Sequence, residues 1–148
     1  MEEIRIVEVK SVVHEYVAAI DSLLEQLTPG LPPFTESDLV SIVSCPNSHL
    51  FLLLSGWKII GMMTIAVYNS PTGKKAWVED VVVDKAYRGK LLGRKLITHA
   101  VNYVREMGDC VLMLTSNSSR KAANHLYQSA GFEQKPTNVY RMKLSKAK

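Results

Sequence analysis

The sequence predicts a mixed α/β (α+β) fold, in which a central, mostly antiparallel sheet is flanked by about four helices. Short apolar runs that fit strands alternate with longer segments whose apolar residues recur at helical spacing. One strand–helix–strand unit, residues 77–115, needs a crossover connection, which makes its two strands parallel. The chain has 148 residues, 47% hydrophobic and 22% charged, as is usual for one globular domain. We therefore expect residues 1–148 to form a single domain.

The first half of the chain predicts one strand, two helices and then three antiparallel strands. We expect strands at residues 4–9, 50–54, 59–67 and 77–83, and helices at residues 12–27 and 36–43. Ser11 is the expected N-cap of the first helix, and Pro29-Gly30 ends it. Ser55-Gly56 and residues 69–73 supply the turns that join the antiparallel strands.

The second half predicts two further helices and three short strands. We expect helices at residues 92–104 and 122–130, a strand at 111–115 and two closing strands at 132–134 and 139–143. Gly108 and Gly131 stand where helices commonly end with glycine. Ser118 or Ser119 is the expected N-cap of the last helix.

Composition limits the classes of protein that need considering. The net charge of +4 is too small by itself to indicate nucleic-acid binding. Cys45 and Cys110 form no C-x-x-C pair, and the four histidines show no metal-ligand spacing, so we expect reduced thiols and no metal. The first residues do not resemble a signal peptide. The longest mostly apolar run has ten residues, whereas a membrane span needs about 20. We expect a soluble, cytoplasmic protein.

The turn at residues 84–95 carries the strongest chemical signal. It follows a strand and opens a helix, so the free N–H groups of the first helical turn can face an anion. Gly89 and Gly93 allow close approach of the backbone. No acidic residue lies in positions 85–95, whereas five basic ones do: Lys85, Arg88, Lys90, Arg94 and Lys95. This pattern predicts a phosphate cradle, with a solvent-exposed basic loop as the alternative. The glycine spacing fits neither a P-loop nor a dinucleotide-binding fingerprint.

Two segments resemble the motifs of a known family, the GCN5-related N-acetyltransferases (GNAT superfamily). Residues 78–96, VEDVVVD followed by YRGKLLGRKL, resemble its motif A, and residues 123–132, ANHLYQSAGF, resemble its motif B. The strand order also matches along nearly the whole chain. The resemblance implies a GNAT fold, with acetyl-CoA in a cleft between two parallel strands that splay apart. Here these would be residues 77–83 and 111–115.

The resemblance also implies which residues hold the cofactor. The pantetheine arm would pair with the backbone of Val81 and Val83, and the pyrophosphate would meet the amides of residues 88–94. Leu91 departs from the family pattern because it stands where a glycine is usual, and its amide can serve if Leu91 keeps a negative φ. Asn124 would bond pantetheine, unless it is a surface asparagine. The full set of cofactor-binding candidates is Val81, Val82, Val83, Arg88, Gly89, Lys90, Leu91, Leu92, Gly93, Arg94 and Asn124.

Two residues are candidates for proton transfer. Glu79 matches the position at which several family members place a general base that acts through a water. Alternation along the strand would send the neighbouring Asp80 to the opposite face. The alternative for Glu79 is a surface or ion-pair role. Tyr127, in the motif-B segment, would protonate the departing thiolate, and its alternative is a helix-core role.

The resemblance implies an acetyl-CoA-dependent N-acetyltransferase that works by direct transfer in a ternary complex. We expect the acceptor to be the primary amine of a small molecule, because the loop at residues 28–35 has no charge. A closing hairpin around residues 135–138 should also border the acceptor. The alternatives are a non-catalytic acyl-CoA sensor, or an acetyltransferase acting on an amino-sugar phosphate or a protein lysine. We expect neither a nucleic-acid nor a membrane partner, and a homodimer stays open.

Overall fold

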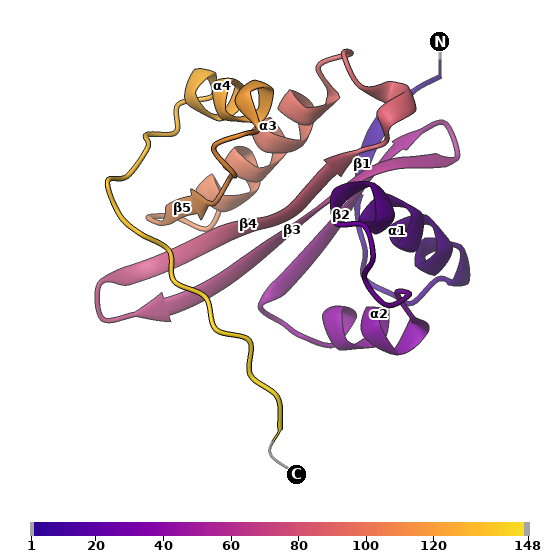
Figure 1. Ribbon diagram of the computed structural model, residues 1–148, viewed down its shortest axis with the longest axis horizontal. Coiled ribbons are helices and arrows are strands. Elements are labelled where there is room, and N and C mark those ends of the chain that lie inside the picture. The colour runs from indigo at the N-terminus through magenta and orange to yellow at the C-terminus, as the bar shows by residue number, and fades with distance from the viewer. Residues whose placement is uncertain (1, 147–148) are drawn as a thin grey trace.

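The computed structural model describes residues 2–146 and contains a five-stranded sheet in the order β1-β2-β3-β4-β5 (Figure 1). The strands are β1 (Ile4–Glu8), β2 (Ser48–Ser55), β3 (Lys58–Ser70), β4 (Gly73–Val83) and β5 (Val111–Leu114). Neighbours are antiparallel from β1 to β4, whereas β4 and β5 are parallel. The expected mixed, mostly antiparallel sheet is therefore confirmed.

Helices cover both faces of this sheet. They are α1 (His14–Leu27), α2 (Glu36–Val43), α3 (Leu92–Arg105) and α4 (Lys121–Ser129), with a short 3-10 turn, η1 (Lys85–Tyr87). Leu50 and Leu52 of β2 pack with α1 and α2, whereas Phe51 and Leu53 pack with α3, as strand alternation requires. The core thus consists of two layers, one on each face of the sheet. Within residues 2–146, no helix is both long enough and apolar enough to cross a membrane.

The helices lie where periodicity predicts them, but two of the expected caps are wrong. Val13, not Ser11, occupies the N-cap of α1, and Arg120, not Ser118 or Ser119, occupies that of α4. Neither makes a side-chain capping bond. Ser119 instead bonds Asn117 within the preceding turn. A short polar side chain can form hydrogen bonds with the backbone of a turn as well as with that of a helix end, so the sequence alone does not determine which of the two it caps.

A β-bulge in β4 changes which face its residues occupy. Met62 pairs with Val82 and Thr64 with Glu79, so Met63 of β3 stands opposite two residues, Asp80 and Val81. Asp80 has a left-handed φ of 51°. Before the bulge, the even-numbered residues of β4 face α3; after it, the odd-numbered ones do, and Val82 packs on the α1 side.

The expected closing strands at 132–134 and 139–143 are wrong for this structure. Residues 133–146 form no helix or strand, and all of them are exposed. The segment leaves α4 and extends past the β3–β4 hairpin (Figure 1). A strand exists only where a neighbour accepts and donates its hydrogen bonds, and this segment has none beside it here.

Candidate active site

The C-terminal half of β4 presents an open backbone edge. The pairing of β4 with β5 covers Lys75–Val78 and ends at the bulge, whereas β4 continues to Val83. The N–H of Asp84 donates to the Ile60 carbonyl of β3 at 2.7 Å. Because backbone groups alternate along a strand, Val82 also faces β3, and Val81 and Val83 direct their backbone groups to the open side.

The side chains of these three valines complete the arrangement. Val81 and Val83 pack against the α3-side core, and Val82 is buried in the α1-side core. Only the main chain of Val81 and Val83 is therefore directed to the open edge. Val82 pairs with Met62 and does not face that edge, so its expected role in cofactor binding finds no support in this geometry. The Val83 carbonyl accepts a bond from Arg88 Nε at 3.1 Å.

The turn after β4 brings free amides next to this edge. Asp84 accepts a bond from the Ala86 N–H and starts η1, and Gly89 has a left-handed φ of 82°. The first backbone bond of α3 runs from Lys95 to the Leu91 carbonyl. The N–H groups of Leu92, Gly93 and Arg94 precede it and have no helical partner. They form the positive end of a 14-residue helix.

Leu91 does not keep the negative φ that the sequence reasoning required. Its φ is 60° and its ψ is 22°, in the left-handed region. A left-handed residue followed by a right-handed helix turns successive N–H groups toward one point, which is a favourable geometry for an anion. The conformation costs about 1–2 kcal/mol for a residue with a Cβ. The side chain is 78% exposed and gains little from packing in return.

The remaining basic and glycine residues of the loop have structural contacts as well. Lys90 lies over the Tyr87 ring, 5.3 Å from its centroid. Arg94 donates to Ser129 Oγ at 2.8 Å and so ties α3 to α4. A Cβ at Gly93 would lie 3.4 Å from Leu126. Helix α4 therefore packs directly over the first turn of α3.

Glu79 and Asp80 lie at the bulge, and both are exposed. The expectation that simple alternation would separate them does not hold, because the bulge inserts Asp80 as an extra residue. Although the Glu79 side chain is exposed, nearby protein atoms partly desolvate its carboxylate, and this raises its pKa. The negative charge of Asp80 raises that pKa further.

Tyr127 is half-buried on α4 and packs against the α3-side core. Its ring meets the Phe132 ring edge-on, with 6.2 Å between the centroids. Burial raises the pKa of the Tyr127 phenol, and the nearby Arg120 charge opposes this only in part. The phenol therefore stays protonated at neutral pH, so it can donate a proton even though it also packs in the core.

Asn124 has a different environment from the one expected. Its Nδ2 donates to the carbonyls of Asn117 at 3.0 Å and Arg120 at 2.9 Å. Both N–H bonds thus fasten the loop before α4, and only Oδ1 is left to accept a bond from a ligand.

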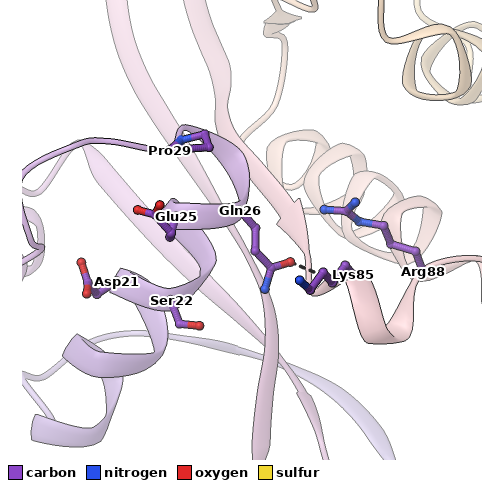
Figure 2. Close-up of a pocket in the computed structure, with 7 residues that line it drawn as sticks. All are labelled: Asp21, Ser22, Glu25, Gln26, Pro29, Lys85 and Arg88. Atoms are coloured by element: carbon purple, nitrogen blue, oxygen red, sulfur yellow. Dashed lines mark hydrogen bonds between the residues drawn. The ribbon is translucent and has the colours of Figure 1, made fainter.

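A pocket between α1 and η1 adds residues that sequence reasoning missed. It has a volume of about 740 Å³ and is lined by Asp21, Ser22, Glu25, Gln26, Pro29, Lys85 and Arg88. Figure 2 shows the α1 residues on one wall and Lys85 and Arg88 on the other. Gln26 Oε1 accepts a bond from the Lys85 N–H at 2.8 Å and joins the walls. The sequence feature that could have indicated this pocket is the polar face of α1. Such a face usually indicates a helix surface exposed to solvent.

The two walls of this pocket differ in charge. Asp21 and Glu25 lie one helical turn apart on α1, and Asp21 also accepts a bond from the Phe34 N–H that holds the α1–α2 loop. Lys85 and Arg88 make the other wall positive. Within residues 2–146, no group of three potential metal-ligating His, Cys, Asp or Glu side chains occurs.

Comparison with known proteins identifies the family of this chain. Residues 17–132 match the model of the acetyltransferase (GNAT) family. The chain belongs to the GNAT acetyltransferase family.

Particular relatives share only part of their length with this chain. It is 36% identical over 67 residues to a streptothricin acetyltransferase from Streptomyces lavendulae, covering 45% of this chain and 35% of that protein. It is 33% identical over 75 residues to the L-amino acid N-acyltransferase MnaT from Escherichia coli, covering 50% of this chain and 44% of that protein. The matched regions are thus less than half the length of either relative.

A solved structure extends the likeness of the fold to nearly the whole chain. A putative acetyltransferase from Agrobacterium tumefaciens superposes with a TM-score of 0.82 at 21% identity, over 95% of this chain and 99% of that one. The GNAT fold expected from the two motifs is therefore confirmed.

The left-handed conformation of Leu91 gives a testable prediction. Leu91→Gly should raise the free energy of unfolding by about 1 kcal/mol, because glycine adopts this φ without steric penalty. Leu91→Ala is the matched control and should stay within about 0.5 kcal/mol of the wild type, since it keeps a Cβ and removes only exposed atoms. Urea denaturation measures both. A glycine variant no more stable than the alanine variant would contradict the left-handed geometry.

Proposed function

We propose that this protein is an acetyl-CoA-dependent N-acetyltransferase that moves an acetyl group to the primary amine of a small molecule by direct transfer. The observation that carries the proposal is the open backbone edge at Val81 and Val83, which lies beside the free amides at the start of α3. An edge of this kind accepts an extended, amide-containing chain by strand addition. A positive helix end accepts a diphosphate. Acetyl-CoA contains both groups, in that order.

The residues present fit the cofactor at each of these points. The amides of Leu92, Gly93 and Arg94 would hold the pyrophosphate, with Gly89 and Lys90 shaping the loop before them. The backbone of Val81 and Val83 would hold the pantetheine arm. Asn124 would contribute only its Oδ1 oxygen, since its N–H groups are in use. When bound, acetyl-CoA supplies an acetyl group activated as a thioester.

Three groups of this chain would move protons and stabilise charge during transfer. Glu79, through a water, removes a proton from the acceptor ammonium, so that the free amine can form the new C–N bond. The Val81 N–H donates to the acetyl oxygen as negative charge develops there. Tyr127 would give its phenolic proton to the sulfur as the C–S bond breaks, and the second proton that the acceptor nitrogen loses on forming the amide would restore the phenol. The raised pKa of Glu79 makes its carboxylate a stronger base, and the raised pKa of Tyr127 keeps its phenol protonated until the thiolate forms.

The charge of the α1 wall supports a small cationic acceptor. Asp21 and Glu25 attract a protonated amine, and neither lies in an ion pair within residues 2–146. An amino-sugar phosphate would need a cationic clamp outside the cofactor loop. The basic residues of the expected closing hairpin are Lys135 and Arg141, but that hairpin is not formed and both residues are exposed. These features favour an amine whose body is neutral or apolar.

Acceptor choice is tested by a thiol-release assay with three amines. An arylalkylamine, whose body apart from the amine is uncharged, should give the highest kcat/KM, above a lysine-containing peptide and glucosamine 6-phosphate. A preference for the sugar phosphate by more than tenfold would reverse the choice of acceptor. Binding of acetyl-CoA by calorimetry without turnover of any amine would favour the non-catalytic sensor instead.

The role of Tyr127 predicts a specific kinetic defect. Tyr127→Phe should lower kcat on the order of 10²–10⁴-fold, because the departing thiolate loses its proton donor. Affinity for acetyl-CoA should stay unchanged, because the ring still packs against Phe132. Tyr68→Phe, which removes a hydroxyl at the β3–β4 hairpin, is the control and should retain activity. Full activity of Tyr127→Phe would leave Tyr127 with a packing role only.

The role of Glu79 predicts a change in the pH–rate profile. Activity should rise with pH through the pKa of Glu79, which is raised above the ordinary value of about 4.3. Glu79→Gln should abolish this acidic limb. Asp80→Asn removes the charge that raises the Glu79 pKa, so it should keep the limb and shift it to lower pH. An unchanged profile in Glu79→Gln would assign the base to another group.

A further inference from the structure

We infer that Gln26 is a positioning residue, which holds the cofactor loop, residues 84–91, against the wall of the pocket that would receive the acceptor amine. The inference rests on the proposed function, because it concerns how that site brings acetyl-CoA and the amine together. Its first observation is a tertiary hydrogen bond. Gln26 Oε1 of α1 accepts the N–H of Lys85, the first residue of η1, at 2.8 Å and across 59 positions of sequence (Figure 2).

The first N–H of η1 needs a partner from outside the turn. The Tyr87 N–H donates to the Asp84 carbonyl at 2.8 Å, and the Ala86 N–H donates to the Asp84 side chain at 3.0 Å. The Lys85 N–H comes too early in the turn for a bond of this kind, as is usual at the start of a helical segment. Gln26 supplies the acceptor, so this glutamine completes the hydrogen bonding of the turn from a neighbouring helix.

The loop is also tied to β3, and these contacts show what Gln26 adds. The Asp84 N–H donates to the Ile60 carbonyl at 2.7 Å, and the Lys58 ammonium lies 5.3 Å from the centroid of the Tyr87 ring. Ile60 and Lys58 both belong to the sheet. Within residues 2–146, the bond from Gln26 is the hydrogen bond that joins residues 84–91 to α1. This bond therefore sets how close the loop lies to α1.

Gln26 also belongs to the acidic wall of the pocket. Glu25 precedes it directly, Ser22 lies one helical turn before it, and all three line the pocket. Figure 2 shows the Gln26 side chain reaching from this wall toward Lys85. The residue therefore connects the wall that would attract the ammonium to the loop that leads into the pyrophosphate site. Because group transfer needs the reacting atoms at a defined separation, a shift between wall and loop would lower the rate.

A glutamine suits this place because its amide oxygen accepts a hydrogen bond and carries no charge. A carboxylate would also accept the Lys85 N–H, but it would add a third negative charge to a wall that already holds Asp21 and Glu25. A methionine has a similar length, and its sulfur is only a weak acceptor. Replacement of Gln26 by methionine therefore removes the bond and keeps most of the bulk of the side chain.

Solvent exchange of the Lys85 amide, measured by NMR on the full chain without ligand, tests the bond itself. Exchange should be about 2- to 10-fold faster in Gln26→Met, because one hydrogen bond of ordinary net strength is lost. Gln26→Glu keeps an acceptor oxygen and should protect this amide as the wild type does. Gln128→Met makes the same change at an exposed position of α4 and is the matched control. Exchange at the wild-type rate in Gln26→Met would overturn the inference.

Calorimetry with CoA and steady-state kinetics then test the positioning role. Gln26→Met should raise the Kd of CoA about 2- to 10-fold and lower kcat/KM for an arylalkylamine at saturating acetyl-CoA, whereas Gln128→Met should change neither. Unchanged kinetics with the amine in Gln26→Met would restrict Gln26 to the loop and overturn its link to the acceptor. Failure of the wild type to bind CoA would overturn the proposed function and the inference together, and the wild-type measurement alone distinguishes that case.

Discussion

The β-bulge at Asp80 is the constraint on which the candidate site depends. The pairing of β4 with β5 ends at Val78, two residues before the bulged Asp80, and within residues 2–146 the rest of β4 has no neighbouring strand on that side. The same bulge reverses the alternation, so that the partly buried side chains of Val81 and Val83 pack against the α3-side core. Their backbone groups face the open side, where the Val83 carbonyl already accepts a bond from Arg88 Nε. The opening is therefore a property of the main chain rather than of any reactive side chain.

Backbone strain in this protein gathers at the same place. Within residues 2–146, the non-glycine residues with positive φ are Asp80 and Leu91. One lies at the bulge and the other at the start of α3, so together they border the open edge and the free amides. Such conformations persist only where the surrounding structure holds them, and they are found preferentially at functional sites. Here Asp80 lies at the bulge that borders the open edge of β4. The left-handed conformation of Leu91 turns the free N–H groups at the start of α3 toward one point.

Local patterns predicted the elements well because each element is stabilised by a repeating contact with the core. The two helices at 12–27 and 36–43, the β2–β3 and β3–β4 hairpins and the parallel pair β4–β5 were all recognisable from periodicity and turn residues. The N-caps of α1 and α4 were not, because serines near a helix start can bond a turn instead. The α1 wall of the pocket was missed because Asp21 and Glu25 look like a solvated helix face until η1 is placed opposite them.

The sequence by itself determined the class of fold, the order of the elements and the basic, glycine-containing turn that marks the family, since these follow from side-chain pattern and local chemistry. Only the tertiary structure decided the left-handed Leu91, the bulge at Asp80 and the separation of Val82 from its neighbours. It also decided that residues 133–146 lie off the sheet. These features depend on register and on contacts between distant segments. The alternating pattern of residues 139–144 indicates which face of a strand would be apolar. It does not specify the strand with which this segment would form hydrogen bonds, because that depends on which sheet edge lies within reach.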